Sequence, residues 1–432
     1  MFGKYDPYCN NELTFVKFVT INRIKMTSID TTPAELFAAK ALASQMKEEL
    51  IYDILPYWSE KMVRPDGALL GRIDGHDNPD PAAPIGAIMT ARVLWTFASA
   101  ARVTGDASLL EMAYRAKSLI INHFYDKENG GTYWSLTPEL EPEDDKKQIY
   151  AIAFVIYGLA ELYRADGDEQ ALDYAKRLYA DIESHSRDHE KNGYFEAFTR
   201  DWGPIADMRL SDKDANESKT MNTHLHILEA YTGLCRVWKD ASLAEALRNL
   251  IVIFLEKILG ADSHLKLFFD DDWNCGYDTV SYGHDIEASW LLYEAAEVLG
   301  EEDLLRRVRE SVPGIVDAAS EGFDPEKGMI YEKHPLRNIV DADRHWWVQA
   351  ESVVGYFNLW QLSGRQDCIE NAVMAWEFIK NNLIDKSCGE WFWSIREDGS
   401  INRDDDKAGF WKCPYHNGRM CMEIIERVNN LV

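Results

Sequence analysis

Two kinds of helical segment alternate along the chain from about residue 35. One kind is amphipathic, with an apolar face and a charged face, as expected of helices that cover a core. The amphipathic segments are residues 35–59, 107–125, 168–186, 241–259, 301–319 and 367–382. The other kind is poor in charge and rich in Ala, Tyr, Trp and Leu, which is typical of a helix buried on all sides. The segments of this second kind are residues 83–104, 147–164, 217–237, 284–299, 344–363 and 415–428.

The connections between these segments repeat as well. A Gly or Lys followed by Asp recurs between helices, where the Gly can take the left-handed conformation after one helix and the Asp can cap the next. These connectors lie at residues 105–109, 167–171 and 239–243, with looser copies at 300–304 and 364–367. A second element, an Asp followed by Gly and aromatic residues, predicts a tight turn into a short strand. It occurs at residues 126–134, 188–195, 324–331 and 385–393.

Self-similarity at a fixed period means one helix pair per repeat, and the chain contains about six pairs. Six buried helices inside six amphipathic ones predict an all-α fold, an (α/α)6 barrel with short β-hairpins in its loops. An open solenoid of helix pairs is the alternative, but a chain that ends after six pairs favours closure. We therefore expect one catalytic domain over residues 34–432.

Residues 1–33 are predicted to form a poorly ordered N-terminal extension. Their apolar run is interrupted by Lys17 and is too short for a membrane span. A small-residue cleavage site is missing, so the run does not resemble a signal peptide. Because Met26 precedes the first helical pattern, residues 1–25 are a candidate upstream extension of the natural start.

The composition indicates which binding partners and which cellular location to expect. The chain is 46% apolar and 12% aromatic, which is enough for a large core, and its formal charge is −27. Such an acidic chain is not expected to bind nucleic acid or an anionic membrane surface, since both are bound by basic patches. Seven cysteines without a CxxC pair indicate a reducing, cytoplasmic location. We expect a monomer or a weak homodimer.

Polar or aromatic residues recur at the starts of the buried helices, about one helix pair apart. They are Arg92, Tyr150, Asn222 with His226, His284 with Glu287, Trp346 with Trp347, and His416. If every buried helix starts at the same end of the barrel, these side chains converge on one central cleft. Histidine can take and give a proton near neutral pH. Two histidines on opposite sides of a pocket could move a proton from one face of a carbon to the other.

Each of these residues also has a purely structural interpretation. A single histidine could be a core residue, Arg92 could belong to a buried ion pair, and Trp346 and Trp347 could be core. The shared repeat phase favours function for His284 and His416. His224 lies on another helix face and is interpreted as structural or as a support for a residue of the site. Residues 270–272 are three aspartates, which we interpret as a solvated acidic loop, so we predict no metal site and no cofactor.

Four segments resemble the cellobiose 2-epimerases of the N-acylglucosamine 2-epimerase superfamily. They are residues 221–229 (MNTHLHILE), 282–287 (YGHDIE), 345–349 (HWWVQ) and 411–419 (WKCPYHNGR). Residues 90–97 and 150–154 fit more loosely, and Ile152 stands where the family usually has Gln. The resemblance runs from about residue 35 to the C-terminus and implies an (α/α)6 barrel.

The resemblance also implies a cofactor-free epimerase. The reducing-end glucose of a β-1,4-linked disaccharide would open, lose its C2 proton, pass through a cis-enediolate and regain a proton on the other face. By motif match, His284 and His416 are the acid/base pair and Glu287 supports His284. Residues around the C1–C2 oxygens would be Arg92, His226, Tyr150 and Asn222. The sugar rings would be bound by Trp411 and by Trp346 or Trp347.

Other activities fit the same residues. A mannobiose 2-epimerase, a monosaccharide 2-epimerase or an aldose–ketose isomerase would use the same chemistry. An (α/α)6 glycoside hydrolase or lyase would need two carboxylates, for which Glu287 and Asp214 are candidates. Asp214 is also a candidate for binding the substrate. A non-catalytic carbohydrate-binding protein would explain the tryptophans but not two histidines at the same repeat phase.

Overall fold

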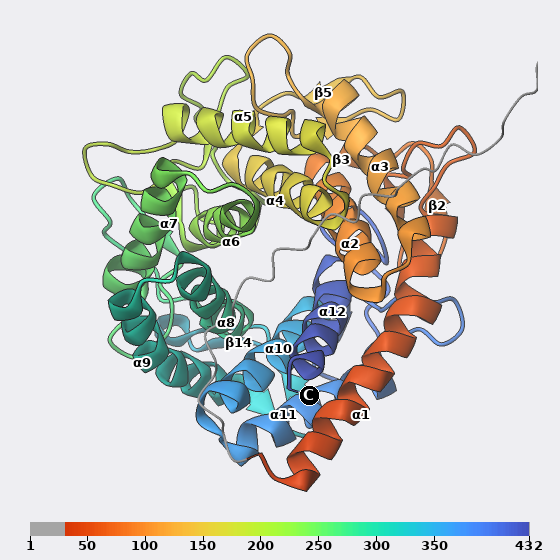
Figure 1. Cartoon of the computed structure of the whole chain (residues 1–432), viewed down its shortest axis with the longest axis vertical. Coiled ribbons are helices and arrows are strands. Elements are labelled where there is room, and N and C mark those ends of the chain that lie inside the picture. The colour runs from red at the N-terminus through yellow and green to blue at the C-terminus, as the bar shows by residue number, and fades with distance from the viewer. Residues whose placement is uncertain (1–30, 432) are drawn as a thin grey trace, which may run out of the picture.

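The computed structural model describes residues 31–431. Within this part of the chain, twelve α-helices form two concentric rings around a central axis (Figure 1). The inner helices are α2 (Ala87–Thr104), α4 (Ile149–Asp166), α6 (Met221–Val237), α8 (Tyr282–Leu299), α10 (Trp346–Ser363) and α12 (Tyr415–Asn429). The outer helices are α1 (Pro33–Glu49), α3 (Leu110–Leu119), α5 (Glu169–His185), α7 (Ala241–Ile253), α9 (Glu302–Ala319) and α11 (Gln366–Phe378).

The inner ring is closed. Each inner helix packs on the next one in chain order, and α12 completes the circle because it packs on both α10 and α2. The outer ring closes in the same region, where α1 packs on α11 and α12 (Figure 1). The predicted (α/α)6 barrel is therefore confirmed, and the open solenoid is wrong. Closure buries the apolar side chains of the first and last pairs against each other, which an open array would leave in water.

Local sequence sets where the helices begin and end. The helices α2, α4, α8 and α10 each end at a glycine with positive φ, between 71° and 82°. The aspartates of the predicted connectors cap the following outer segments: Asp106 accepts from Ser108 N–H, and Asp168 accepts from Ala171 N–H. Asp240 accepts from the amides of Ser242 and Leu243. These residue types supply the backbone conformation and the acceptors that helix ends require.

Several outer helices continue into short irregular turns. π-Helical segments cover Leu50–Ile54, Tyr57–Lys61, Ile120–Phe124, Phe254–Ile258 and Ile379–Leu383. Short 3-10 segments cover Ala107–Leu109, Ser320–Gly322 and Pro335–Arg337. The outer helix α1 begins at Pro33, directly after Thr32, whose side chain and that of Glu35 form a reciprocal cap. The first described helix begins one residue before the start that we predicted for the domain. Most of the extension predicted over residues 1–33 lies outside the described residues.

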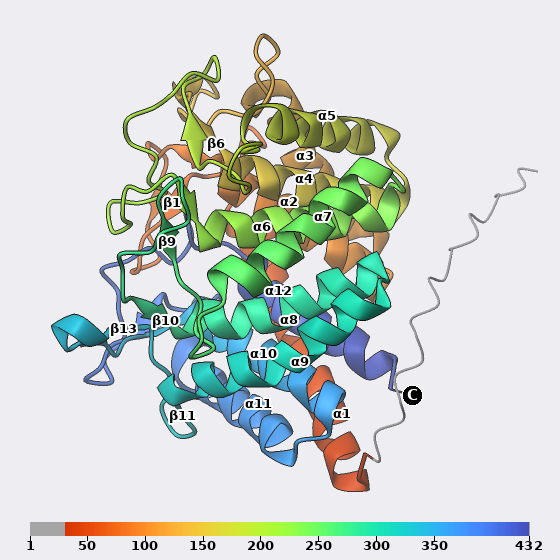
Figure 2. The ribbon, with the colours of Figure 1, turned by 90° about the vertical axis from the view of Figure 1, so that its left-hand side faces the viewer.

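Short antiparallel strands fill the loops, as predicted. They are β1 (Arg72–Ile73), β2 (Pro79–Asp80), β3 (Ile85–Gly86), β4 (Ser135–Leu136), β5 (Pro142–Asp144), β6 (Lys147–Gln148), β7 (Ala197–Phe198), β8 (Lys219–Thr220), β9 (Phe268–Phe269), β10 (Val280–Ser281), β11 (Phe323–Asp324), β12 (Gly328–Met329), β13 (Glu332–His334), β14 (Ile339–Asp341), β15 (Arg344–His345) and β16 (Ser394–Ile395). The pairs are β1–β2, β3–β4–β5, β6–β7, β8–β9, β10–β13–β14, β11–β12 and β15–β16. Figure 2 shows the strands gathered at one end of the barrel.

The predicted Asp–Gly turns follow four of the outer helices. In each turn the Asp side chain accepts hydrogen bonds from the amides two and three residues further on, at 2.9–3.3 Å. The Asp residues are Asp126, Asp188, Asp324 and Asp385. Three of them also pair with a buried lysine, at 3.0 Å for Lys147, 2.7 Å for Lys219 and 2.5 Å for Lys407. Because Lys147 and Lys219 lie just before α4 and α6, these pairs tie the outer turns to the starts of inner helices.

In the described part of the chain, no helix is both long and apolar enough to cross a membrane. The six cysteines there are all free thiols. The cytoplasmic location stays a prediction.

Candidate active site

The six inner helices all begin at the end of the barrel that carries the strands (Figure 2). Five of them start directly after a strand: β3 leads into α2, β6 into α4, β8 into α6, β10 into α8 and β15 into α10. Their first turns therefore share one end of the barrel, as the repeat phase predicted. The candidate residues at these first turns come together there.

His284 and His416 contact the same side chain, the indole of Trp347. The ring centroids lie 4.8 Å apart for His284 and Trp347, and 5.7 Å apart for His416 and Trp347. This packing depends on Gly283, since a Cβ there would lie 2.5 Å from the Trp347 ring. Two imidazoles from distant helices, α8 and α12, thus line the same space.

Each of these imidazoles is held through its Nδ1 atom. His284 Nδ1 hydrogen-bonds Ser281 Oγ at 2.8 Å, and His416 Nδ1 lies 2.7 Å from Glu351 Oε1. A carboxylate only accepts hydrogen bonds, so His416 Nδ1 carries the hydrogen and its Nε2 keeps the lone pair. Within residues 31–431, neither Nε2 atom makes a hydrogen bond. The Nε2 atoms are therefore the ones available to a substrate.

Burial keeps the histidines neutral. Burial lowers the pKa of His284 to about 3, with a smaller contribution from the nearby His226. Burial likewise lowers the pKa of His226 to about 3 and holds the pKa of His416 well below its usual range. A neutral imidazole has the lone pair that a general base needs.

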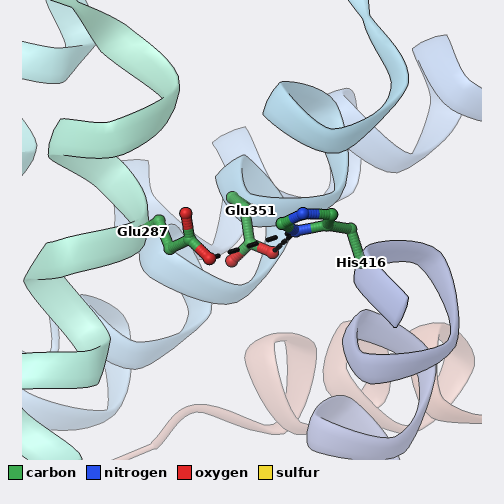
Figure 3. Close-up of side chains that lie close together, drawn as sticks. All are labelled: Glu287, Glu351 and His416. Carbon is green, nitrogen blue, oxygen red and sulfur yellow. Dashed lines mark hydrogen bonds and ion pairs between the residues drawn. The ribbon is translucent and has the colours of Figure 1, made fainter. Parts of the chain in front are cut away.

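Beneath the histidines, a buried guanidinium joins three carboxylates. Arg419 Nη2 donates to Glu287 Oε1 and Glu351 Oε1, both at 2.6 Å, while Nη1 donates to Glu229. The Tyr415 hydroxyl donates to the same Glu229 carboxylate. Figure 3 shows Glu287, Glu351 and His416 converging from α8, α10 and α12. We call Arg419, Glu229, Glu287, Glu351 and His416 the Arg419 cluster.

The carboxyl groups of the Arg419 cluster bind protons more readily than exposed ones. Burial raises the pKa of Glu287 and of Glu351, and the mutual repulsion of the carboxylates adds to the effect, while the Arg419 charge opposes it. Burial also raises the pKa of Glu229. The cluster can therefore hold a proton next to His416.

Glu287 does not contact the histidine that we predicted as its partner. Glu287 was expected to support His284, but its Oε1 accepts from Arg419 and lies 4.0 Å from His416 Nδ1. Ser281, three residues before His284, holds that imidazole instead. The i, i+3 spacing correctly predicted that Glu287 and His284 share a helix face. Glu287 lies one turn further along α8, however, where its carboxylate reaches Arg419 of α12.

Four residues of the site were missed by the sequence interpretation: Glu229, Glu351, Tyr415 and Arg419. All four lie on inner helices and are at most 1% exposed. Three of them could have been found from their spacing. Glu229, Glu351 and Arg419 are charged residues on otherwise apolar helices, three or four positions after the candidates His226, Trp347 and His416. Such spacing puts both side chains on one face, and a buried charge requires a partner.

Arg92 is not part of an ion pair. Among the described residues its guanidinium donates to Tyr150 Oη at 2.9 Å and to the Trp411 carbonyl at 3.3 Å. Its carbon Cζ lies 4.2 Å from the centre of the Phe154 ring and 4.8 Å from that of Tyr415. Aromatic faces attract a cation without neutralising it, so the positive charge remains available to a developing oxyanion.

Next to Arg92, the side chains of Tyr150 and His226 extend the site. Their ring centroids lie 4.9 Å apart, and His226 Nδ1 lies 2.9 Å from Glu229 Oε2, which connects His226 to the Arg419 cluster. Asn222 is half-buried, and its Oδ1 is buried without a hydrogen-bond partner among the described residues. His224 differs from His226: its Nδ1 bonds the Thr220 carbonyl and its Nε2 accepts from Tyr194 N–H. Both ring nitrogens of His224 are thus engaged by backbone groups, as expected of a structural residue.

The remaining candidates lie at the edges of this group. Trp346 packs on Trp393 with centroids 4.6 Å apart, and its buried indole N–H has no partner within residues 31–431. Trp411 is half-buried, and its ring centroid lies 6.3 Å from that of Tyr150. Asp214 is bound within its own loop, where its carboxylate accepts from Ser211 N–H and Oγ–H, both at 2.9 Å. No contact joins Asp214 to the histidines in the described part of the chain.

The geometry brings potential metal ligands together at one point of this site. Single ligand atoms of Glu287, Glu351 and His416 lie within 4.8 Å of one another. The Arg419 guanidinium already donates to both carboxylates, and its charge would repel a dication. The acidic loop is different: the Asp270 carboxylate accepts from the amides of Asp272 and Asn274, as in a solvated turn.

Turnover is therefore expected to survive extensive treatment with EDTA, because histidine, arginine and buried carboxyl groups supply the acid/base and charge-stabilising roles. The measurement is kcat before and after chelation, with metal content determined on the same samples. A loss of kcat that one divalent ion restores would contradict this prediction and would show that turnover depends on a bound ion.

Comparisons with known proteins agree with this site. A family model described as N-acylglucosamine 2-epimerase (GlcNAc 2-epimerase) matches residues 70–418. The chain is 60% identical to a cellobiose 2-epimerase of Bacteroides fragilis over 89% of this chain and 98% of that protein. A solved structure of cellobiose 2-epimerase from Bacillus thermoamylovorans superposes with a TM-score of 0.86 at 38% identity, covering 90% of this chain and 100% of that one.

A more distant structure shows only the fold. A D-mannose isomerase superposes with a TM-score of 0.76 at 19% identity, over 93% of this chain and 99% of that chain. The family model covers most of the barrel and every histidine of the site. The glycoside hydrolase and binding-protein alternatives are therefore set aside, and the chain belongs to the N-acylglucosamine 2-epimerase family.

Proposed function

We propose that this protein epimerises C2 of the reducing-end sugar of β-1,4-linked disaccharides, converting cellobiose to glucosylmannose. The observation that carries the proposal is the pair of imidazoles, His284 and His416, that contact one indole and keep both Nε2 atoms free. Epimerisation at a carbon next to a carbonyl needs one group to remove a proton and another to return it. The relatives named cellobiose 2-epimerase support the choice of substrate.

In the first step the sugar ring opens, and one neutral imidazole takes the C2 proton onto Nε2. The electron pair of the C2–H bond moves into the C1–C2 bond, and the C1 oxygen gains negative charge. Such a proton is weakly acidic, so the enediolate needs preorganised positive charge and hydrogen-bond donors. Arg92 supplies the charge, because its guanidinium is held by aromatic faces rather than by carboxylates. Arg92 donates to the Tyr150 hydroxyl, and the His226 ring lies against the Tyr150 ring on the same side of the site.

In the second step the other imidazole takes up a proton, from water or from the Arg419 cluster, because the negative enediolate beside it now favours the charged form. It then gives its Nε2 proton to the opposite face of C2 and is neutral again. The first imidazole is left with the proton it removed and must release it before the next turnover. The Arg419 cluster can take up and return the proton, since Glu351 contacts His416 Nδ1 and burial raises the pKa of that carboxyl. No cofactor is needed in this scheme, because the C2 hydrogen leaves and returns as a proton.

A single incubation with cellobiose tests the proposal. Formation of glucosylmannose supports it, release of glucose would indicate hydrolysis, and no change on cellobiose would contradict the choice of substrate. A panel with mannobiose, lactose, glucose and mannose then defines specificity. Fructose-containing products would show that the enediolate is also protonated at C1, as in aldose–ketose isomerisation.

Solvent exchange is a further expected result. A histidine that has taken the C2 proton can exchange it with water before its partner donates. Epimerised product formed in D2O is therefore expected to carry deuterium at C2, measured by NMR or mass spectrometry. Substrate kept in D2O without enzyme is the control. Product without label would contradict the two-histidine transfer and would point to a shielded or hydride route.

A further inference from the structure

A second group of potential metal ligands lies away from the two histidines, where the β13–β14 arm returns to the barrel. The arm pairs with β10 through β13 and projects from the strand-bearing end of the molecule (Figure 2). It leads through Ala342 and Asp343 into β15, whose last residue, His345, directly precedes α10. Single ligand atoms of Asp341, Asp343 and His345 lie within 4.8 Å of one another.

The two carboxylates are oriented by backbone amides. Asp341 Oδ1 accepts from the N–H of Asp343 at 3.1 Å, and Asp343 Oδ1 accepts from the N–H of Glu397 at 3.0 Å. In residues 31–431, the second oxygen of each carboxylate makes no hydrogen bond. Each aspartate therefore presents one fixed and unengaged oxygen.

His345 is the independent observation that points to a ligand. It is only 8% exposed, and its ring lies against Tyr331 with the centroids 4.0 Å apart and the planes at 9°. Within the described residues neither ring nitrogen has a hydrogen-bond partner. One ring nitrogen lies close to the two aspartates, so the imidazole is placed to share a ligand with them. Burial lowers the pKa of His345 to about 3, so its lone pair is available near neutral pH.

The surroundings are rich in negative charge. Glu332 pairs with Asp341 across the β13–β14 register. Burial, followed by the charges of Asp341 and Asp214, raises the pKa of Glu332 to about 7. Lys213 acts on His345, and Arg396 and Arg344 act on Asp343, so three cations supply opposing charge. The Arg344 guanidinium itself donates to the Ala342 carbonyl. A dication at this point would relieve repulsion between carboxylates.

We propose that Asp341, Asp343 and His345 bind a divalent transition-metal ion, Mn²⁺ or Zn²⁺, that ties the β13–β14 arm to the start of α10. One imidazole nitrogen with two carboxylate oxygens suits these ions, whereas Ca²⁺ and Mg²⁺ prefer oxygen ligands alone. Water would complete the coordination. Because His345 precedes Trp346 and Trp347, the ion would stabilise the helix start beside the histidines without taking part in proton transfer.

The test uses Mn²⁺ and the purified full chain. We expect saturable binding of about one ion per chain, with a ¹⁴N coupling in the electron spin-echo spectrum and a raised melting temperature. The variant His345→Phe keeps a ring to stack on Tyr331 but removes both nitrogens, and Asp341→Asn changes an exposed ligand. Both variants are expected to bind Mn²⁺ at least about tenfold more weakly, and His345→Phe to lose the ¹⁴N coupling.

Matched controls separate this site from other acidic groups. The variant Asp272→Asn alters an exposed aspartate of the acidic loop, and Glu351→Gln alters the potential ligands beside His416. Both are expected to bind Mn²⁺ like the unmodified protein. No saturable binding, or equal binding by His345→Phe and Asp341→Asn, would overturn the proposal. Because the readout is metal binding, these outcomes are independent of whether the protein epimerises cellobiose.

Discussion

Replacing His284 or His416 by Ala is expected to lower kcat/KM for cellobiose epimerisation by about 10²- to 10⁴-fold, as removal of a general acid or base typically does. Both groups are needed, because one removes the C2 proton and the other returns it on the opposite face. His284→Ala would remove the hydrogen-bond partner of Ser281 Oγ, and His416→Ala would remove one hydrogen-bond partner of Glu351. The measurement is the initial rate of glucosylmannose formation, with circular dichroism to confirm the helical fold.

The single variants also separate the two roles. An enzyme that lacks only the second histidine keeps its base, so it can still exchange the C2 hydrogen of one epimer with D2O while epimerisation is blocked. His189→Ala is the control, because His189 is exposed on the turn after α5 and is expected to retain full activity. Substantial epimerisation by either site variant with an intact fold would refute the two-histidine assignment.

Replacing Arg419 by Met is expected to cost about 3–5 kcal/mol of stability, the usual penalty for removing one partner of a buried ion pair. Arg419 donates to Glu229, Glu287 and Glu351, and all four side chains are 1% exposed. Without the guanidinium, these carboxyl groups would have to take up protons or remain unpaired. The midpoint of urea unfolding is expected to fall, and kcat to fall with it, because Glu351 also holds His416.

A surface arginine with a similar set of partners provides the comparison. Arg365 pairs with Asp317 and Asp367, both at 2.6 Å, but its side chain is 36% exposed. Arg365→Met is expected to cost less than about 1 kcal/mol, because solvent screens exposed pairs. Arg419→Lys keeps the charge but loses the planar arrangement of donors, so it is expected to recover only part of the stability. Equal stability of Arg419→Met and Arg365→Met would contradict a central role for the Arg419 cluster.

Much of the barrel could be predicted from local sequence, because its causes are local. The alternation of amphipathic and apolar helices, the connectors such as Gly105–Asp106, and turns such as that of Asp126 each depend on neighbouring residues. The repeat phase also indicated that Arg92, Tyr150, His226, His284 and His416 share one end of the barrel. That inference needed only the period of the helix pairs and the assumption that each inner helix starts at the same end.

Which side chains meet across the barrel axis depends on how the helices pack. Contacts such as Arg419 with Glu229, or His416 with Glu351, join residues far apart in sequence, and no local pattern encodes their pairing. The assignment of Glu287 to His284 failed for this reason: helix spacing fixes a face, but the partner depends on depth along the axis and on what the opposite helix presents. Local patterns in the chain are enough to predict the helices, their order and the end of the barrel where the candidate residues lie. Only ring closure, which packs α12 between α10 and α2, decided how the acid, base and charge are connected.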